Sequence, residues 1–94
     1  MAHRIELSAE WGAYAGELGR TLARIRHERG LSQERVAAMA GISSTQYQKY
    51  EKGQSRPGGP MNPTLVNLIA LSQALGVTVA ELLPPSPPDL TMGA

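Results

Sequence analysis

Cysteine is absent from the 94 residues. The chain therefore has no disulfide framework, no thiolate metal site and no thiol nucleophile. No apolar run approaches the roughly 18 residues of a membrane-spanning helix, and the N-terminus lacks the continuous apolar stretch of a signal peptide. We expect a soluble, cytoplasmic protein that folds as one domain around a modest core.

Residues that carry catalysis or hold metals and nucleotides are missing as well. His3 and His27 have no carboxylate or second histidine at ligand spacing, so we predict no metal site. The sequence SRPGG lacks the Gly-Lys-Ser/Thr ending of a phosphate-binding loop. No serine, histidine and aspartate are arranged as a nucleophilic triad. We predict that the protein is not an enzyme and needs no cofactor.

The net charge of +1 is distributed unevenly along the chain. Residues 20–56 carry eight basic side chains against three acidic ones, a balance of +5, whereas residues 1–19 and 57–94 each balance to −2. A cationic segment inside a nearly neutral chain is typical of a protein that binds nucleic acid. Taken alone, the charge distribution is weak support for that function.

The cationic segment contains a pattern of two short helices joined by a tight turn, QERVAAMAGISSTQYQKYEK at residues 33–52. Ser32 is the candidate N-cap of the first helix, and Gly41 can take the positive φ that a helix C-terminus favours. Ser43 with Gln46 three residues later predicts a capping box at the start of the second helix.

The second helix separates into two faces when its residues are placed at about 100° intervals. Tyr47 and Tyr50 lie on one face, together with Ser43. The opposite face carries hydroxyl, amide and ammonium groups and no carboxylate; its members are Thr45, Gln48, Lys49 and Lys52, flanked by Ser44 and Gln46. A solvated face usually mixes both signs of charge, whereas this set suits DNA base edges and phosphates.

These residues resemble the Cro and phage-repressor type of helix-turn-helix, also called the xenobiotic-response-element family. The resemblance covers about residues 18–83 and rests on GLSQ at 30–33, QKYEKG at 48–53, small Ala37, turn Gly41, and apolar Val36, Ala40, Ile42, Tyr47 and Tyr50. Tyr47 is bulkier than the Ile or Val usual at its position. GGP at 58–60 also lengthens the loop that follows.

The predicted fold is an all-α, compact bundle of five helices of the lambda-repressor-like type. The helices are expected at about 9 or 17–29, 33–40, 44–52, 63–75 and 79–83. Residues 1–16 would be an N-terminal arm or helix extension, 17–83 the DNA-binding domain, and 84–94 a proline-rich tail that is stiff and then disordered. Three glycines before residue 20 argue against a strong helix there.

The later part of the chain gives three further local expectations. Residues 54–63 should be an irregular loop, since three prolines and two glycines interrupt them. Asn62 would cap the next helix, with Pro63 at its first position. That helix should turn Leu65, Leu68, Ile69, Ser72 and Leu75 inward. Thr78 and Glu81 predict a capping box for a last turn that buries Val79, Leu82 and Leu83.

The resemblance implies sequence-specific binding of double-stranded DNA by a transcriptional regulator, more specifically a repressor, with helix 44–52 in the major groove. Candidate base contacts are Ser44, Thr45, Gln48 and Lys49, and candidate backbone contacts are Gln33, Ser43, Lys52 and Arg56. Each of these could instead be an idle surface side chain. The resemblance also implies that Arg26 and Glu51 form a structural ion pair; the alternative is two unrelated surface charges.

One such domain covers little DNA, so we expect a homodimer that contacts itself through the N-terminal arm, the last helix or the tail. Trp11 and Tyr14 would either cover the domain's own core or contact the second subunit. An alternative function is a protein-interaction module of the same fold, such as an antitoxin or an adaptor with a protein partner. A large exposed apolar patch away from residues 44–52, or no DNA binding at low salt, would favour that alternative.

Overall fold

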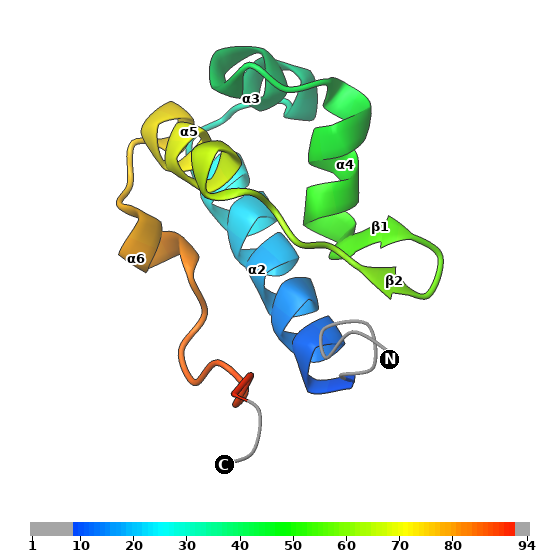
Figure 1. Cartoon of the computed structure of the whole chain (residues 1–94). Helices are drawn as coiled ribbons and strands as arrows, with labels where there is room; N and C mark the ends of the chain where they lie inside the picture. The colour runs from blue at the N-terminus through cyan, green and yellow to red at the C-terminus, as the bar shows by residue number, and fades with distance from the viewer. Residues whose placement is uncertain (1–8, 92–94) are drawn as a thin grey trace.

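The structure, a computed structural model, describes residues 9–91 and forms a helical bundle with one short hairpin (Figure 1). Its elements are α2 (Ala9–Glu28), α3 (Gln33–Ala40), α4 (Ser44–Lys52), β1 (Gln54–Arg56), β2 (Gly59–Pro60), α5 (Leu65–Leu75) and α6 (Val79–Leu82). Five helices agree with the predicted fold class. None of them, within residues 9–91, has the length and apolar character needed to span a bilayer. Residues 1–8 of the predicted N-terminal arm or helix extension lie outside the described residues.

Helix α2 has the longer of its two predicted extents, because it continues without a break from Ala9 to Glu28. The glycines before residue 20 do not end it, and two of them permit close packing. A Cβ atom on Gly19 would overlap backbone carbonyl oxygens at the end of α4. A Cβ atom on Gly53 would lie 2.7 Å from the Cα of Gly16. The C-terminal end of α4 therefore packs directly on the backbone of α2, and no larger residue fits there.

A single core fills the space between α2 and the helices around it. Figure 1 shows α4 on one side of α2 and α5 with α6 on the other, with α3 across one end. The buried residues come from every helix, and they are Ala15, Leu18, Leu22, Ile25, Val36, Ala37, Tyr47, Tyr50, Met61, Leu71, Leu75 and Leu82. Apolar residues at spacings of three and four along α2 account for its buried face.

The inward face predicted for α5 is wrong in part. Leu65 is 67% exposed and Ile69 is 41% exposed, whereas Leu71 is fully buried. The buried positions follow the i, i+3, i+4 helical pattern from a half-buried Leu68 through Leu71 and Ser72 to Leu75. The error arises because α5 is rich in leucine and isoleucine on more than one side, so hydropathy alone did not determine its rotation.

The chain between α4 and α5 also differs from the prediction. Residues 54–60 form an antiparallel hairpin in place of an irregular loop, with Gln54 opposite Pro60 and Arg56 opposite Gly59. The N-cap of α5 is Thr64, whose side-chain oxygen accepts from Asn67 N at 3.1 Å, so the predicted cap at Asn62 and first position at Pro63 are wrong. A threonine three residues before Asn67 competes with Asn62 as a cap, and the extended segment after the hairpin favours the later start.

The end of the described chain folds back onto α2. The capping box of Thr78 and Glu81 is formed, and Leu82 is buried, but Leu83 is 41% exposed and α6 ends before it. The Tyr14 hydroxyl donates to Pro84 O at 2.8 Å, and Ser86 and Pro88 line a shallow groove along α2. Residues 84–88 of the predicted tail therefore lie against the N-terminal half of α2.

Candidate nucleic-acid interface

Capping contacts define both helices of the predicted helix-turn-helix. Ser32 Oγ accepts from Arg35 N at 3.0 Å at the start of α3, and Gly41 ends that helix with φ 73°. Ser43 Oγ accepts from Gln46 N at 3.0 Å at the start of α4. Of the predicted capping box only this half is present among the described residues. A residue with a side chain would be strained at the φ of Gly41, so the turn between the two helices depends on glycine.

The two faces of α4 lie as the helical wheel predicts. Tyr47 and Tyr50 are buried in the core, and the Tyr50 hydroxyl accepts from Asn67 Nδ2 at 2.8 Å, which ties α4 to α5. On the opposite face, Thr45, Lys49 and Lys52 are exposed and Ser44, Gln46 and Gln48 are half-buried. No carboxylate lies on this outer face of α4.

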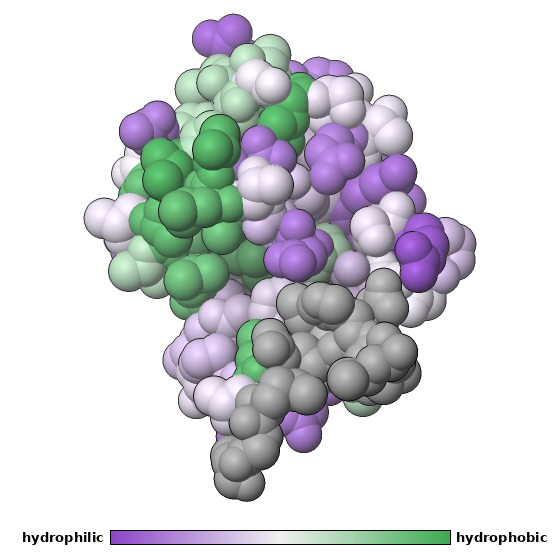
Figure 2. All heavy atoms as spheres, in the orientation of Figure 1, coloured by the Kyte–Doolittle hydropathy of each residue, from purple (hydrophilic) through white to green (hydrophobic). Residues whose placement is uncertain are grey.

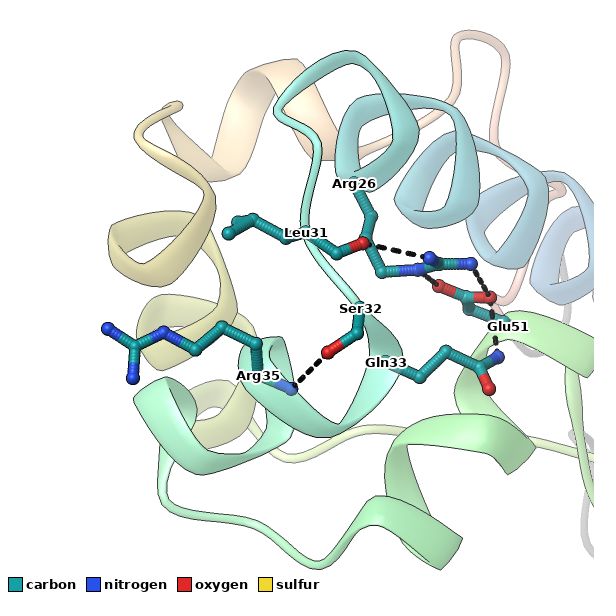
Figure 3. Close-up of polar contacts among 6 residues, drawn as sticks. All are labelled: Arg26, Leu31, Ser32, Gln33, Arg35 and Glu51. Carbon is teal, nitrogen blue, oxygen red and sulfur yellow. Dashed lines mark hydrogen bonds and ion pairs between the residues drawn. The ribbon is translucent and has the colours of Figure 1, made fainter.

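Figure 3 shows how the C-terminal end of α4 is held by side chains from α2 and α3. Arg26 Nε donates to Glu51 Oε2 at 2.6 Å, and its Nη2 donates to Oε1 at 3.1 Å. Arg26 Nη1 also donates to Leu31 O at 3.0 Å, and Gln33 Nε2 donates to Glu51 Oε1 at 2.9 Å. The two charged side chains are only 11% and 9% exposed, so each depends on the other for compensation.

Burial and hydrogen bonding act in opposite directions on the Glu51 carboxyl. Burial alone would raise the pKa of Glu51, but the hydrogen bond from Arg26 and the further bond from Gln33 outweigh it, so the pKa is lowered. Glu51 is therefore ionised at neutral pH. The resulting pair fixes α4 on α2, and it lies on the opposite side of α4 from the exposed lysines.

Tyr47 is the unusual residue of this network. Its hydroxyl is buried, and it makes no hydrogen bond of good geometry with any part of residues 9–91. Burial raises the pKa of Tyr47, and the neighbouring Glu51 carboxylate raises it further, so the phenol stays neutral. The core accommodates the ring of Tyr47, which is larger than the Ile or Val usual at this position. Its hydroxyl is left without a hydrogen bond beside a buried ion pair.

The predicted contact residues differ in their exposure to solvent. Ser43, Thr45, Lys49, Lys52 and Arg56 are exposed, and Ser44 and Gln48 are half-buried on the same helix. Gln33 is half-buried, and its amide already donates one of its two N–H groups to Glu51. One N–H of Gln33 therefore remains for a phosphate. Gln54 and Ser55 are exposed on β1, and sequence reasoning missed them because it interpreted Pro57-Gly58 as a loop where it is a hairpin turn.

Elsewhere the described residues offer little chemistry. No group of three histidine, aspartate or glutamate side chains in residues 9–91 is placed to hold a metal ion. A shallow groove between the end of α2 and α6 is lined by Arg24, Glu28, Arg29 and Glu81, which mix both charge signs. The outer face of α4 with its adjoining hairpin instead carries neutral hydrogen-bonding groups and cations.

A family model described as a helix-turn-helix domain matches residues 17–83, most of the chain. The chain belongs to this helix-turn-helix family. The resemblance to the Cro and phage-repressor type is confirmed, and the matched region coincides with the predicted domain.

Individual helix-turn-helix relatives are similar over most of their length. An uncharacterised HTH-type transcriptional regulator of Sinorhizobium fredii is 41% identical over 69 residues, which are 73% of this chain and 82% of the relative. The restriction-modification controller protein C.AhdI from Aeromonas hydrophila superposes with a TM-score of 0.66 at 31% identity, over 76% of this chain and 98% of that protein. SinR, a master regulator for biofilm formation solved in complex with DNA, has a TM-score of 0.60 at 27% identity, over 69% of this chain and 95% of that one.

Two segments lie outside the region that matches the helix-turn-helix family model, and they contact each other in the structure. Residues 9–16 are the first two turns of α2, and residues 84–88 are the segment that lies against them. Trp11 Nε1 in the first segment donates to Met61 O at 3.0 Å, directly after the hairpin. Trp11 and Tyr14 therefore cover the domain's own core, and their ring centroids are 5.8 Å apart.

Proposed function

We propose that this protein is a sequence-specific, double-stranded DNA-binding transcriptional regulator that acts as a repressor. The observation that carries this function is the outer face of α4, which is capped, anchored through Glu51, and free of carboxylates. Two relatives support the same function: the transcriptional regulator from Sinorhizobium fredii is similar in sequence over most of the chain, and the DNA-bound SinR is similar in fold.

When the protein binds DNA, the N-terminal end of α4 enters the major groove and α3 lies across the DNA backbone. Ser44, Thr45, Gln48 and Lys49 face base edges. Ser43, Lys52 and Arg56 face phosphates, and Gln33 reaches a phosphate with its remaining N–H while Glu51 holds the other. The free N–H groups at the start of α3 add a partial positive charge beside Gln33.

Selection of bound sequences from a random pool of duplexes tests this function. We expect an enriched inverted repeat whose half-sites lie about one helical turn apart, because each subunit presents one α4. Enrichment of a single half-site would contradict binding as a dimer, but it would not contradict sequence-specific binding of DNA. No enrichment at any salt concentration would contradict the function itself and favour a protein-interaction module.

We further propose that the protein is a homodimer and that its contact surface is the apolar face of α5 and α6. Leu65, Val66 and Ile69 on α5, and Leu83 directly after α6, are exposed large apolar residues, and Val66 is 74% exposed. Figure 2 shows hydrophobic side chains gathered over this part of the molecule. The dimer contact that was expected to use the last helix, α6, would thus also include α5.

Charge favours a second copy as the occupant of this face. Residues 57–80 contain no charged side chain, so α5 offers nothing for an oppositely charged partner to match. In a two-fold contact each residue near the axis meets its own copy, and a charge there would repel itself. An apolar, uncharged face is therefore self-complementary. Exposed apolar patches of this kind mark interaction sites.

Val66→Glu tests the surface by placing a charge against its own copy. We expect this variant to sediment as a monomer and to bind a two-part site much more weakly, while its melting temperature changes little because Val66 is exposed. Ala9→Glu, which adds the same charge at an exposed position on α2, is the control and should remain a dimer. A Val66→Glu dimer of unchanged strength would place the contact elsewhere.

A further inference from the structure

The Tyr47 hydroxyl is an unused hydrogen-bond donor inside the contacts that hold α4. Tyr47 is fully buried, and its hydroxyl is the buried side-chain polar atom of residues 9–91 that has no hydrogen-bond partner. Such a group lowers stability, because the bond to water that it gives up on folding is not replaced. Buried polar groups in proteins are almost always paired, so an acceptor within reach of this hydroxyl is expected.

The Glu51 carboxylate is the acceptor that lies beside this hydroxyl. Tyr47 and Glu51 are four residues apart on α4, so their side chains project from the same side of the helix, one turn apart. Glu51 and Arg26 both act on the pKa of Tyr47, which places the phenol next to the ion pair. A guanidinium has no acceptor atom. The carboxylate is therefore the charged group that can pair with the hydroxyl.

The direction of the Glu51 carboxylate keeps it from Tyr47. Its Oε2 accepts from Arg26 Nε at 2.6 Å, and its Oε1 accepts from Arg26 Nη2 at 3.1 Å and from Gln33 Nε2 at 2.9 Å. An ionised carboxylate can accept about four hydrogen bonds, so one position is still free. The hydroxyl does not use that position. The carboxylate is thus turned away from the phenol by the donors that already hold it.

Of these donors, the Gln33 amide is the one that can be drawn away. Arg26 makes a further bond from Nη1 to Leu31 O at 3.0 Å and is only 11% exposed. Gln33 is half-buried at the start of α3, and its amide reaches across to Glu51 (Figure 3). A phosphate on the second N–H of Gln33 would place two anions about 5 Å apart, because each lies about 2.9 Å from the same nitrogen. The two anions repel, and the bond from Gln33 to Glu51 weakens.

We propose that Tyr47 is a reserve donor for Glu51, and that its hydroxyl turns onto the carboxylate when a phosphate draws on the Gln33 amide. The bonds from Arg26 to Glu51 persist in both arrangements, so α4 stays anchored while the protein is on DNA. Tyr47 is a positioning residue, because it acts through Glu51 and does not touch DNA. The exchange on DNA rests on the proposed function, whereas the competition between Gln33 and Tyr47 for Glu51 is a property of the protein alone.

Melting without DNA tests the competition, using Tyr47→Phe and Gln33→Ala singly and together. In the wild-type background, Tyr47→Phe should raise the melting temperature by up to about 5 °C, because it removes an unpaired buried hydroxyl. In the Gln33→Ala background the carboxylate is free to turn and the hydroxyl is bonded, so Tyr47→Phe should lower the melting temperature instead. Equal shifts in the two backgrounds would mean that Tyr47 only fills space, and would overturn the reserve bond.

Tyr50→Phe is the matched control for these measurements. It also removes a phenol hydroxyl from the inner side of α4, but the partner of that hydroxyl is Asn67. Its effect on the melting temperature should therefore be the same with Gln33 and with alanine at that position. A dependence of Tyr50→Phe on Gln33 equal to that of Tyr47→Phe would also overturn the specific bond to Glu51.

Affinity for the selected duplex tests the exchange on DNA. Tyr47→Phe should bind roughly threefold to tenfold more weakly than wild-type protein, although it is more stable, because the bound state lacks one hydrogen bond to the carboxylate. In the Gln33→Ala background the same substitution should leave the affinity unchanged, since the hydroxyl is bonded before and after binding. Wild-type affinity for Tyr47→Phe would overturn the exchange. Wild-type protein that binds no duplex would overturn the proposed function and the exchange with it, and the melting measurements would then decide the reserve bond by themselves.

Discussion

Two neighbouring regions of this small protein differ most in charge. Residues 20–56 carry eight basic and three acidic side chains, and residues 57–80 carry none. The first region contains α3, α4 and β1; the second contains α5, whose exposed side chains include Leu65 and Val66. Both regions pack on the same core, so charge on the outer surface, and not burial, distinguishes the proposed DNA-binding face from the proposed dimer face.

The cationic region also contains charges that are not for DNA. Arg26 and Glu51 lie on the inner side of α4 at low exposure, and Lys49 and Lys52 lie on its outer side. A count of charges cannot separate these roles, whereas substitutions can.

The largest effect is expected when Glu51 is replaced by alanine. Removing the carboxylate leaves the Arg26 guanidinium buried without its partner, so the free energy of unfolding should fall by about 3–5 kcal/mol. Glu34→Ala removes the same charge from an exposed position on α3 and should change stability by less than about 0.5 kcal/mol. Chemical denaturation of both variants at neutral pH measures the difference.

The same pair gives a pH dependence with a definite sign. Because the pKa of Glu51 is lower in the folded chain than its ordinary value of 4.5, the pair contributes stability above that value. This stability is lost as the pH falls from about 4.5 through the folded pKa. Wild-type protein should therefore lose more stability than Glu51→Ala over that range. Parallel acid losses would show that the carboxylate is not stabilised in the folded state.

Gly19→Ala should have the next largest effect. The added methyl group would overlap backbone carbonyl oxygens of α4, so the helices must separate and stability should fall by about 3 kcal/mol. Gly12→Ala is the matched control on the same helix, because a Cβ atom there meets nothing within 4 Å. That variant should gain up to about 1 kcal/mol from helix propensity. Equal thermal shifts for the two variants would contradict the close packing of α4 on α2.

A smaller effect is expected from Lys52→Ala, which removes a charge from the outer side of α4. The slope of log K against log salt should become shallower by about one unit per subunit, since one phosphate contact is lost. Arg24→Ala removes the same charge from α2, where Arg24 pairs with Glu28 at 3.2 Å, and should leave the slope unchanged. Equal slopes for all three proteins would show that Lys52 does not contact phosphate.

The helix-turn-helix was predictable from sequence because its signals are local. Ser32, Gly41 and Ser43 each act within one helical turn, and the wheel separates Tyr47 from Lys49 without knowledge of the rest of the chain. The glycines of α2 were misjudged because their role depends on α4, which lies far away in sequence. Helix propensity describes an isolated helix, whereas the close packing of α4 stabilises this one despite its glycines.

The region after α4 was predicted less well for the same physical reason. The hairpin depends on Trp11 and Gly16, which are distant in sequence, and the start of α5 depends on where the hairpin ends. On α5, leucines occur on both the buried and the exposed faces, so periodicity gives no single answer. The proposed dimer surface accordingly includes Leu65, Ile69 and Leu83, which the sequence placed in the core by mistake.

The central claim is that the outer face of α4 reads bases, and Gln48 tests it most directly. Its amide can pair with the N6 and N7 edge of adenine, a contact that distinguishes base pairs by about 1–3 kcal/mol. Affinities of wild-type protein and Gln48→Ala are measured on the selected site and on every single-base substitution of it. We predict that Gln48→Ala loses its preference at one position of each half-site and binds sites already substituted there as well as wild-type protein does. An equal loss of affinity on every sequence would contradict the claim, because a contact that is insensitive to sequence is a contact to the backbone.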